Sequence, residues 1–377
     1  MEYNGILSKF SFASNKNGRS HEITNPKENQ MMQKDFGALR ADTVKSFDRH
    51  KAFNYLRIVI TVITFFTIAT KVHLGWIGQI GKRGFGLLSI AFLATVVGIA
   101  LSALRWSGAL EVLKVKSKFS DLFKLQLVGL FASNFLPSTV GGDIVRARWL
   151  GKRNDQVAEG FASVIIERLT GWLVLPCLAL IGIAFDPAML HLGKVSGIII
   201  TIATATLTAL LILITFTIIK KQVKPEGRFK ALSAVIASLS SGIKQFKEDP
   251  ASLVKLIAWA IAYQLSIVTA ALFAASAIHI SITWRELLVM VPTVAMLQVL
   301  PLTIGGIGIR EGALVLMLQP LGIATTQAIE FGLVVYGINV LASLLGAPSF
   351  ALGAPHRESV ASASSITASD NRPSSDS

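Results

Sequence analysis

Two nearly identical segments hold the residues whose types and spacing stand out chemically. "LPSTVGGDIVR" occupies positions 136–146 and "LPLTIGGIGIR" occupies positions 300–310. Both read Leu-Pro-x-Thr-(Val/Ile)-Gly-Gly-x-x-(Val/Ile)-Arg, with an amide residue, Asn134 or Gln298, two positions upstream. Each copy interrupts an apolar stretch with proline and paired glycines, which are poor residues for a helix interior.

The chemistry that this pattern suggests is phosphate binding. The residues after Gly-Gly predict a helix start, with Asp143 suited by charge to the first turn. A helix N-terminus leaves backbone N–H groups unpaired, and glycine lets an anion approach them closely. Arg146 and Arg310, in matching positions, would add guanidinium groups suited to phosphate. The alternative is that proline and glycine only let two hairpins turn and pack, with both arginines at the membrane interface.

Composition places these motifs in a membrane. Of the 377 residues, 52% are hydrophobic and only 15% are charged, whereas soluble domains have about 25% charged residues. The net charge of +14 comes mainly from tails and loops, where cytoplasmic loops and the anionic lipids of the inner leaflet account for it. No basic-aromatic stripe that would stack bases is present, so nucleic acid is not an expected partner.

The hydropathy pattern predicts an all-α polytopic membrane protein of six full spans and two re-entrant hairpins. The predicted spans are 55–72, 85–104, 158–184, 195–219, 253–279 and 327–352. The stretches 121–150 and 286–323 are broken midway, and neither half of either is long enough to cross about 30 Å of hydrocarbon. If each hairpin crossed fully instead, the protein would have eight spans.

The spans define a transmembrane domain between two polar tails. Residues 1–50 and the Ser-rich residues 355–377 predict disordered cytoplasmic tails. The domain, 51–354, divides into halves at about 51–194 and 195–354. Between 226 and 250 the spacing predicts an amphipathic helix on the inner leaflet, or an ordinary helical connector.

Loop charges predict the orientation. The positive-inside rule puts both termini in the cytoplasm. We expect a multi-pass protein of the plasma (inner) membrane. The first hairpin then enters from the cytoplasm and the second from outside, so the two motifs lie in halves of inverted topology. Inverted repeats with broken helices that meet near the midplane are typical of transporters.

Other charges within the predicted spans need partners. Glu167 and Arg168 are expected to pair with Arg146 or Asp143, to line a path for a polar group, or to form a purely structural ion pair. Glu311 is positioned to balance Arg310. The Arg105-Trp106 pair is expected to anchor the inner interface at the end of its span.

Enzyme signatures are absent from the sequence. It contains no HExxH, no GxSxG and no P-loop, and its six histidines have no metal-ligand spacing. We therefore expect no catalytic residue, no metal and no cofactor.

The segments "SNFLPSTVGGDIVRARWL", "VIIERLTGW" and "VLPLTIGGIGIREGALV" resemble the transmembrane region of the lysyl-phosphatidylglycerol synthase/flippases over about residues 55–350. The resemblance implies movement of a polar-headed lipid between leaflets. The residues that match by position are Asn134, Pro137, Gly141, Gly142, Asp143, Arg146, Glu167, Arg168, Pro301, Gly305, Gly306, Arg310 and Glu311. Thr139, Gln298 and Thr303 complete the candidate substrate-binding set. The soluble aminoacyl-transfer domain of the bifunctional proteins is missing, so aminoacylation is not expected.

The expected function is that of a lipid flippase or transporter. Its cargo would be a phosphate-bearing lipid of the aminoacyl-, glyco- or isoprenoid-linked kind, moved passively or by a gradient. One alternative is a membrane-embedded transferase that acts on a lipid phosphate, with Asp143 or Glu167 as general base. The other is a non-catalytic partner of a lipid-modifying enzyme. Whether the protein also associates with such an enzyme, or with a second copy of itself, is left open.

Overall fold

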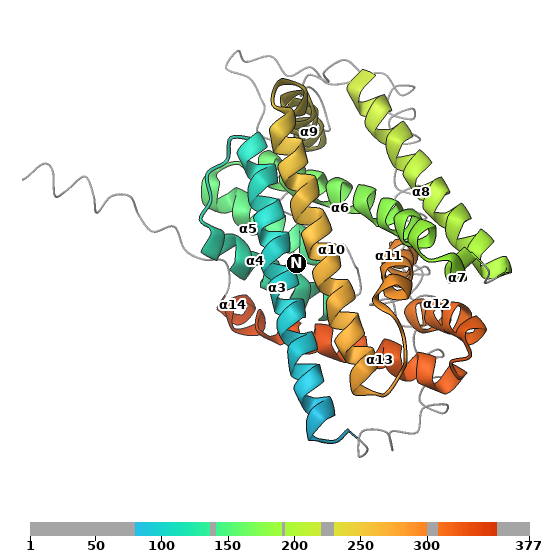
Figure 1. Cartoon of the computed structure of the whole chain (residues 1–377). Coiled ribbons are helices and arrows are strands. Elements are labelled where there is room, and N and C mark those ends of the chain that lie inside the picture. The colour runs from blue at the N-terminus through green and yellow to red at the C-terminus, as the bar shows by residue number, and fades with distance from the viewer. Residues whose placement is uncertain (1–79, 136–140, 191–192, 220–229, 300–307, 353–377) are drawn as a thin grey trace, which may run out of the picture. The chain divides into compact units, whose positions relative to one another are not determined.

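The computed structural model describes residues 80–135, 141–190, 193–219, 230–299 and 308–352 (Figure 1). Within these ranges the secondary structure is helical, without strands, which confirms the all-α prediction. Both predicted tails and the first predicted span, 55–72, lie outside the described residues.

Five of the described helices are long and apolar enough to cross a membrane. They are α3 (Lys82–Val112), α6 (Val157–Phe185), α8 (Lys194–Ile219), α10 (Pro250–Ala277) and α13 (Thr325–Leu344). Each coincides with one of the last five predicted spans, so the polytopic architecture is confirmed. The total of six spans stays a prediction because the first one is not described.

The two broken apolar stretches each form a pair of short helices. The first pair is α4 (Phe119–Phe135) and α5 (Gly141–Asn154), and the second is α11 (Trp284–Gln298) and α12 (Ile309–Leu318). The longest of these, α4, has 17 residues, or about 26 Å, which is shorter than the hydrocarbon core. An ion pair between Arg153 Nη1 and Asp121 Oδ2, 2.9 Å apart, joins the end of α5 to the start of α4. The arms of this hairpin are therefore antiparallel.

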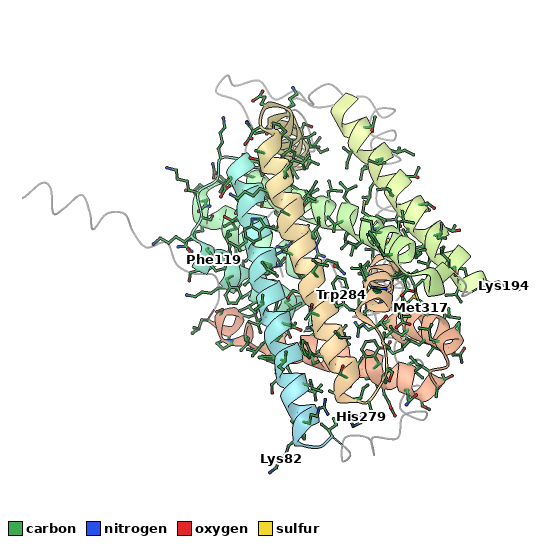
Figure 2. All side chains as sticks on the ribbon, in the orientation of Figure 1. Lys82, Phe119, Lys194, His279, Trp284 and Met317 are labelled. Atoms are coloured by element: carbon green, nitrogen blue, oxygen red, sulfur yellow. The ribbon has the colours of Figure 1, made fainter. Side chains whose placement is uncertain are left out.

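Helices α3 and α10 form an antiparallel pair (Figure 1). Gly84, near the start of α3, lies beside the end of α10, because a Cβ added there would come 3.1 Å from the carbonyl oxygen of Ala277. At the other end, Gly108 faces Leu256 in the same way, with 3.1 Å to its Cδ1. Figure 2 shows Lys82 and His279 at the same end of this pair. Since α4 follows α3 and α11 follows α10, the two hairpins begin at opposite ends of the pair.

The packing of the second half repeats that of the first. Helix α6 packs against α11, the hairpin arm of the other half, and α13 packs against α4 in the same way. Both α3 and α10 contact both α6 and α13. These reciprocal contacts of α6 with α11 and of α13 with α4, together with the antiparallel α3–α10 pair, are expected of an inverted repeat.

Helix α9 (Lys230–Glu248) occupies the segment for which an amphipathic helix was predicted. Its Leu239 and Phe246 pack against the buried cluster that contains Trp106. A Cβ added at Gly242 would come 2.7 Å from Cδ1 of Ile166, so the helix lies directly on α6. This packing favours the alternative of a connector helix over one whose apolar face is free for lipid.

The remaining described elements are short. They are α7 (Pro187–Leu190), a 3-10 turn η2 (Gln319–Leu321) and α14 (Ala347–Ala351). Helix α7 follows α6, and its Met189 is buried in the large apolar core formed mainly by α6, α10, α11, α12 and α13. Helix α14 follows α13 and packs back against α4.

Candidate functional site

The first motif starts a helix as predicted. Helix α5 begins at Gly141, with Asp143 in its first turn and Lys152 and Arg153 in its last. These charges complement the helix dipole at both ends. Arg146 then lies in the second turn, where its side chain reaches back towards Asp143 and across to the neighbouring helices.

The Arg146 side chain is buried and fully engaged. Only 2% of it is exposed. Its Nε donates to Asp143 Oδ1 at 3.0 Å, Nη1 donates to Gln126 Oε1 at 2.6 Å, and Nη2 donates to Glu167 Oε2 at 2.5 Å. The guanidinium also lies over the Trp106 ring, 4.8 Å from its centroid. Helices α4, α5 and α6 are thus joined through one guanidinium group.

Glu167 lies between two arginines. Its Oε1 accepts hydrogen bonds from Arg105 Nε and Nη2, and its Oε2 accepts from Arg146. Ser102 also donates to Oε1, at 3.2 Å. With 1% of its side chain exposed, this carboxylate is stable only because opposite charges and hydrogen bonds surround it. The predicted pairing of Glu167 with Arg146 is confirmed.

The prediction that Arg105-Trp106 anchors the inner interface is wrong. Both residues are buried, and α3 continues past them to Val112. Arg105 points to Glu167, and Trp106 Nε1 donates to Ser163 Oγ on α6 at 2.9 Å. The buried carboxylate supplies the compensating charge that the interface would otherwise have to provide.

Asp143 connects the buried part of this network to its accessible part. Arg168 Nε and Nη2 donate to the two oxygens of Asp143, at 2.9 and 3.0 Å, in a bidentate pair. The predicted pairing of these two residues is therefore confirmed as well. Unlike Arg146, the Arg168 side chain is 44% exposed. Among the three arginines of the network, Arg168 is the one that a ligand would reach first.

Glycines make room for this network. A Cβ added at Gly142 would overlap the backbone oxygen of Gly129 and the hydroxyl of Ser133, so α4 and α5 can approach closely only without a side chain there. A Cβ at Gly171 would come 2.5 Å from Arg105 Nη1. The second glycine of the first motif therefore serves the packing of α4 against α5. This role agrees with the alternative in which the glycines only let the hairpins turn and pack.

The second motif has a different local structure. Helix α12 begins at Ile309, after Gly308 with a φ of 91°, and Arg310 therefore lies in its first turn. The Gly308 N–H donates to Glu311 Oε2 at 2.6 Å. With the Gln298 amide oriented so that its oxygen faces the guanidinium, that oxygen accepts from Arg310 Nε at 3.1 Å and Nη2 at 2.9 Å.

Arg310 also lies beside an aromatic ring and a carboxylate. Its guanidinium lies over the Tyr336 ring, 4.7 Å from the centroid. Glu311 Oε1 is 3.8 Å from Arg310 Nη1, at the outer limit of an ion pair, which agrees with the predicted balance of charge. The partners described for Arg146 differ from those described for Arg310. Binding of one phosphate by both arginines stays a prediction.

Several predicted site residues cannot be placed. Pro137, Thr139, Pro301, Thr303, Gly305 and Gly306 lie outside the described residues. Asn134, at the end of α4, is described, and its Nδ2 is buried without a hydrogen-bond partner in the part of the chain that the structure describes.

The sequence analysis missed four polar or aromatic residues of these groups and named Arg105 only as an interface anchor. The four are Ser102, Gln126, Tyr263 and Tyr336. Ser102 and Arg105 are three residues apart on α3 and so share a face. Gln126 is a lone amide in the apolar arm "LFKLQLVGLF", which is the kind of residue that marks a buried polar contact.

Comparison with known proteins agrees with this architecture. The family model described as "Lysylphosphatidylglycerol synthase TM region" matches residues 54–346. A UPF0104 membrane protein of Methanocaldococcus jannaschii is 31% identical over 83 residues, which are 21% of this chain and 24% of that relative. The match to this relative therefore spans only about a quarter of its length. No solved structure matches significantly. Because the family model covers most of the chain, including both hairpins, the protein belongs to the family of the lysylphosphatidylglycerol synthase transmembrane region.

Proposed function

We propose that the protein moves a lipid with a phosphate-bearing headgroup between the two leaflets of its membrane. Family membership supports a role in lipid handling. The inverted packing of two broken hairpins supports transport, because discontinuous helices in inverted repeats form the substrate sites of many transporters.

The observation that carries this proposal is the ionic network between α3, α5 and α6, which is buried around Glu167 and accessible at Arg168. It contains three guanidinium groups, from Arg105, Arg146 and Arg168, and two carboxylates, from Asp143 and Glu167. Its formal charge is therefore +1. Ionised groups inside membrane spans are costly and usually mark a path for a polar or charged substrate. An excess of one positive charge suits an anionic headgroup.

Arg168 is the residue that would receive the headgroup. Its guanidinium presents a planar fork that matches phosphate as well as carboxylate. Because Asp143 is shared with Arg146, it can keep that partner while an incoming phosphate replaces it on Arg168. The lipid tails would stay in the bilayer while the headgroup follows the polar interior, as the cost of carrying a charge through hydrocarbon requires.

The same geometry argues against the transferase alternative. A general base needs an oxygen within hydrogen-bonding reach of the substrate proton. Both oxygens of Asp143 accept from Arg168, and both oxygens of Glu167 accept from arginines. Carboxylates held in this way are suited to positioning arginines rather than to taking a proton.

Reconstitution into liposomes tests the proposal. Fluorescent phosphatidylglycerol, its aminoacyl form and a polyprenyl phosphate would each be followed between leaflets, with and without an imposed membrane potential. We expect headgroup-selective exchange for the wild type and a loss of at least about tenfold for Arg168→Gln, because a charge-assisted contact is removed. The double variant Arg146→Ala/Arg310→Ala tests the two motif arginines in the same assay.

Arg148→Gln is the matched control. Arg148 is an exposed arginine of α5, two residues from Arg146, and its replacement should leave exchange unchanged. Exchange of none of the three lipids by the wild type would overturn the proposal. Equal loss in Arg148→Gln and Arg168→Gln would show that surface charge, and not the site, governs the rate.

A further inference from the structure

Gln264 is a buried amide in the middle of a membrane span. It occupies the fifteenth position of the 28-residue helix α10, and 4% of it is exposed. Ala260 and Val268, one turn before and after it, are buried in the large apolar core. Gln264 thus faces the interior of the helix bundle and not the lipid.

The nitrogen of the Gln264 amide has no hydrogen-bond acceptor among the described residues. This Nε2 atom is buried. Two hydroxyl groups near it on the same helix have hydrogen-bond acceptors, since Ser266 donates to the Ala94 carbonyl and Thr269 to the Leu265 carbonyl. A buried N–H without an acceptor destabilises a protein, and more so where no water can replace the missing partner. Such a group in a native structure calls for an explanation, and a ligand that accepts its hydrogen bond is one.

Gln264 lies near the middle of the α3–α10 pair and next in sequence to a residue that contacts the ionic network. The antiparallel contacts of α3 with α10 run from Gly84 beside Ala277 to Gly108 beside Leu256, with Gly98 beside Ile267 between them. Gln264 therefore lies near the midpoint of the pair about which the two halves are related. The preceding residue, Tyr263, has the centroid of its ring 5.4 Å from Arg105 Cζ. Gln264 is therefore the next residue along α10 after one that contacts the ionic network.

We propose that the Gln264 side-chain amide donates a hydrogen bond to an oxygen of the lipid headgroup as that headgroup passes the centre of the membrane. This inference rests on the proposed lipid transport and assigns it a second contact beyond Arg168. The chemistry fits, since a neutral amide donates to phosphate, ester or hydroxyl oxygens alike and adds no charge that must itself be desolvated. Its ligand class is therefore any oxygen-rich polar headgroup.

Replacement by leucine separates a ligand contact from a structural one. A structural amide would lose its partner in Gln264→Leu and the protein would unfold at a lower temperature. An amide reserved for a ligand has no partner to lose, so Gln264→Leu should unfold at the same or a higher temperature in detergent. Gln264→Asn keeps the amide but shortens its reach, and it should give an intermediate effect on the ligand.

Two readouts on each variant complete the test. The first is leaflet exchange of fluorescent phosphatidylglycerol in phosphatidylcholine vesicles, expected to be about tenfold slower in Gln264→Leu. The second is the rise in unfolding temperature that phosphatidylglycerol causes in detergent, which reports binding without transport and should be reduced. Gln319→Leu, at an exposed glutamine of η2, is the control and should match the wild type in both.

Each outcome decides the proposal. A lower unfolding temperature for Gln264→Leu without lipid, or unchanged exchange together with unchanged lipid stabilisation, overturns the Gln264 contact. If the wild type shows no exchange but its stabilisation by lipid is lost in Gln264→Leu, the contact stands and the transport function fails. If the wild type shows neither exchange nor stabilisation, both proposals fail.

Discussion

At the scale of single residues, the network around Glu167 depends on charge balance. This carboxylate is buried and bonded to Arg105 and Arg146, so neutralising it leaves two guanidinium groups without their shared partner. We expect Glu167→Gln to destabilise the protein by about 3 to 5 kcal/mol, the usual cost of breaking a buried pair. Thermal unfolding in detergent measures this loss.

The exposed ion pair between Lys255 and Glu111 provides the comparison. Its atoms are 2.8 Å apart, yet both side chains are half exposed. Glu111→Gln should therefore cost less than about 1 kcal/mol. Equal unfolding temperatures for Glu111→Gln and Glu167→Gln would mean that the buried network does not hold α3, α5 and α6 together.

Gly142 permits a second prediction at this scale. A methyl group there would overlap the Gly129 carbonyl, so Gly142→Ala must force α4 and α5 apart. We expect a loss of about 1 to 3 kcal/mol or more, measured by thermal unfolding. At Gly337, in α13, a Cβ meets nothing within 4 Å, and Gly337→Ala should be neutral or stabilising because alanine favours helix. A stable Gly142→Ala would show that the two helices are not in close contact.

The sequence could indicate these residues only in part. Charges inside apolar spans must find partners, and this rule gave pairing of Glu167 and Arg168 with Arg146 or Asp143 as one of the alternatives. The same rule failed for Arg105, because a charge near the end of an apolar run is expected to reach the interface. Only the fold shows that α3 continues to Val112 and that Glu167 lies opposite Arg105.

At the scale of elements, the short helix α14 holds the first hairpin. Its Phe350 ring lies 5.4 Å from Phe131 of α4 and 6.2 Å from Trp149 of α5, so one side chain contacts both arms. Removing it should loosen the hairpin, since each aromatic pair contributes about 0.5 to 1.5 kcal/mol. We expect Phe350→Ala to speed amide hydrogen exchange in α4 and α5. Leu352→Ala, at a residue that is 87% exposed, should leave that exchange unchanged.

Local backbone chemistry explains why the two motifs differ as elements. Both read Pro-x-Thr-x-Gly-Gly, but the first copy continues with Asp143 whereas the second has a further glycine, Gly308. Gly308 adopts a positive φ, and the described helix begins only after it, at Ile309. The shared motif predicted the same helix start in both copies, but after the additional glycine helix α12 begins only at Ile309. The spans were easier to predict, because length and hydropathy alone define them.

At the scale of the whole molecule, the repeated motif and the number of spans between its copies predicted inverted halves. What they could not predict is how the halves interlock. Each hairpin packs on the last span of the other half, α4 on α13 and α11 on α6. Such contacts are distant in sequence and leave no local pattern.

The orientation of the molecule gives the last prediction. Lys82 begins α3 and Lys116 follows its end, so the 31-residue helix, about 46 Å long, separates them. Basic residues concentrate near the second end, where the positive-inside rule predicts the cytoplasm. In a Cys177→Ser background, Lys82→Cys should react with an impermeant maleimide on intact cells. Lys116→Cys should react only after permeabilisation. The reverse pattern would place the first hairpin on the outer side and require the headgroup to enter the Arg168 site from there.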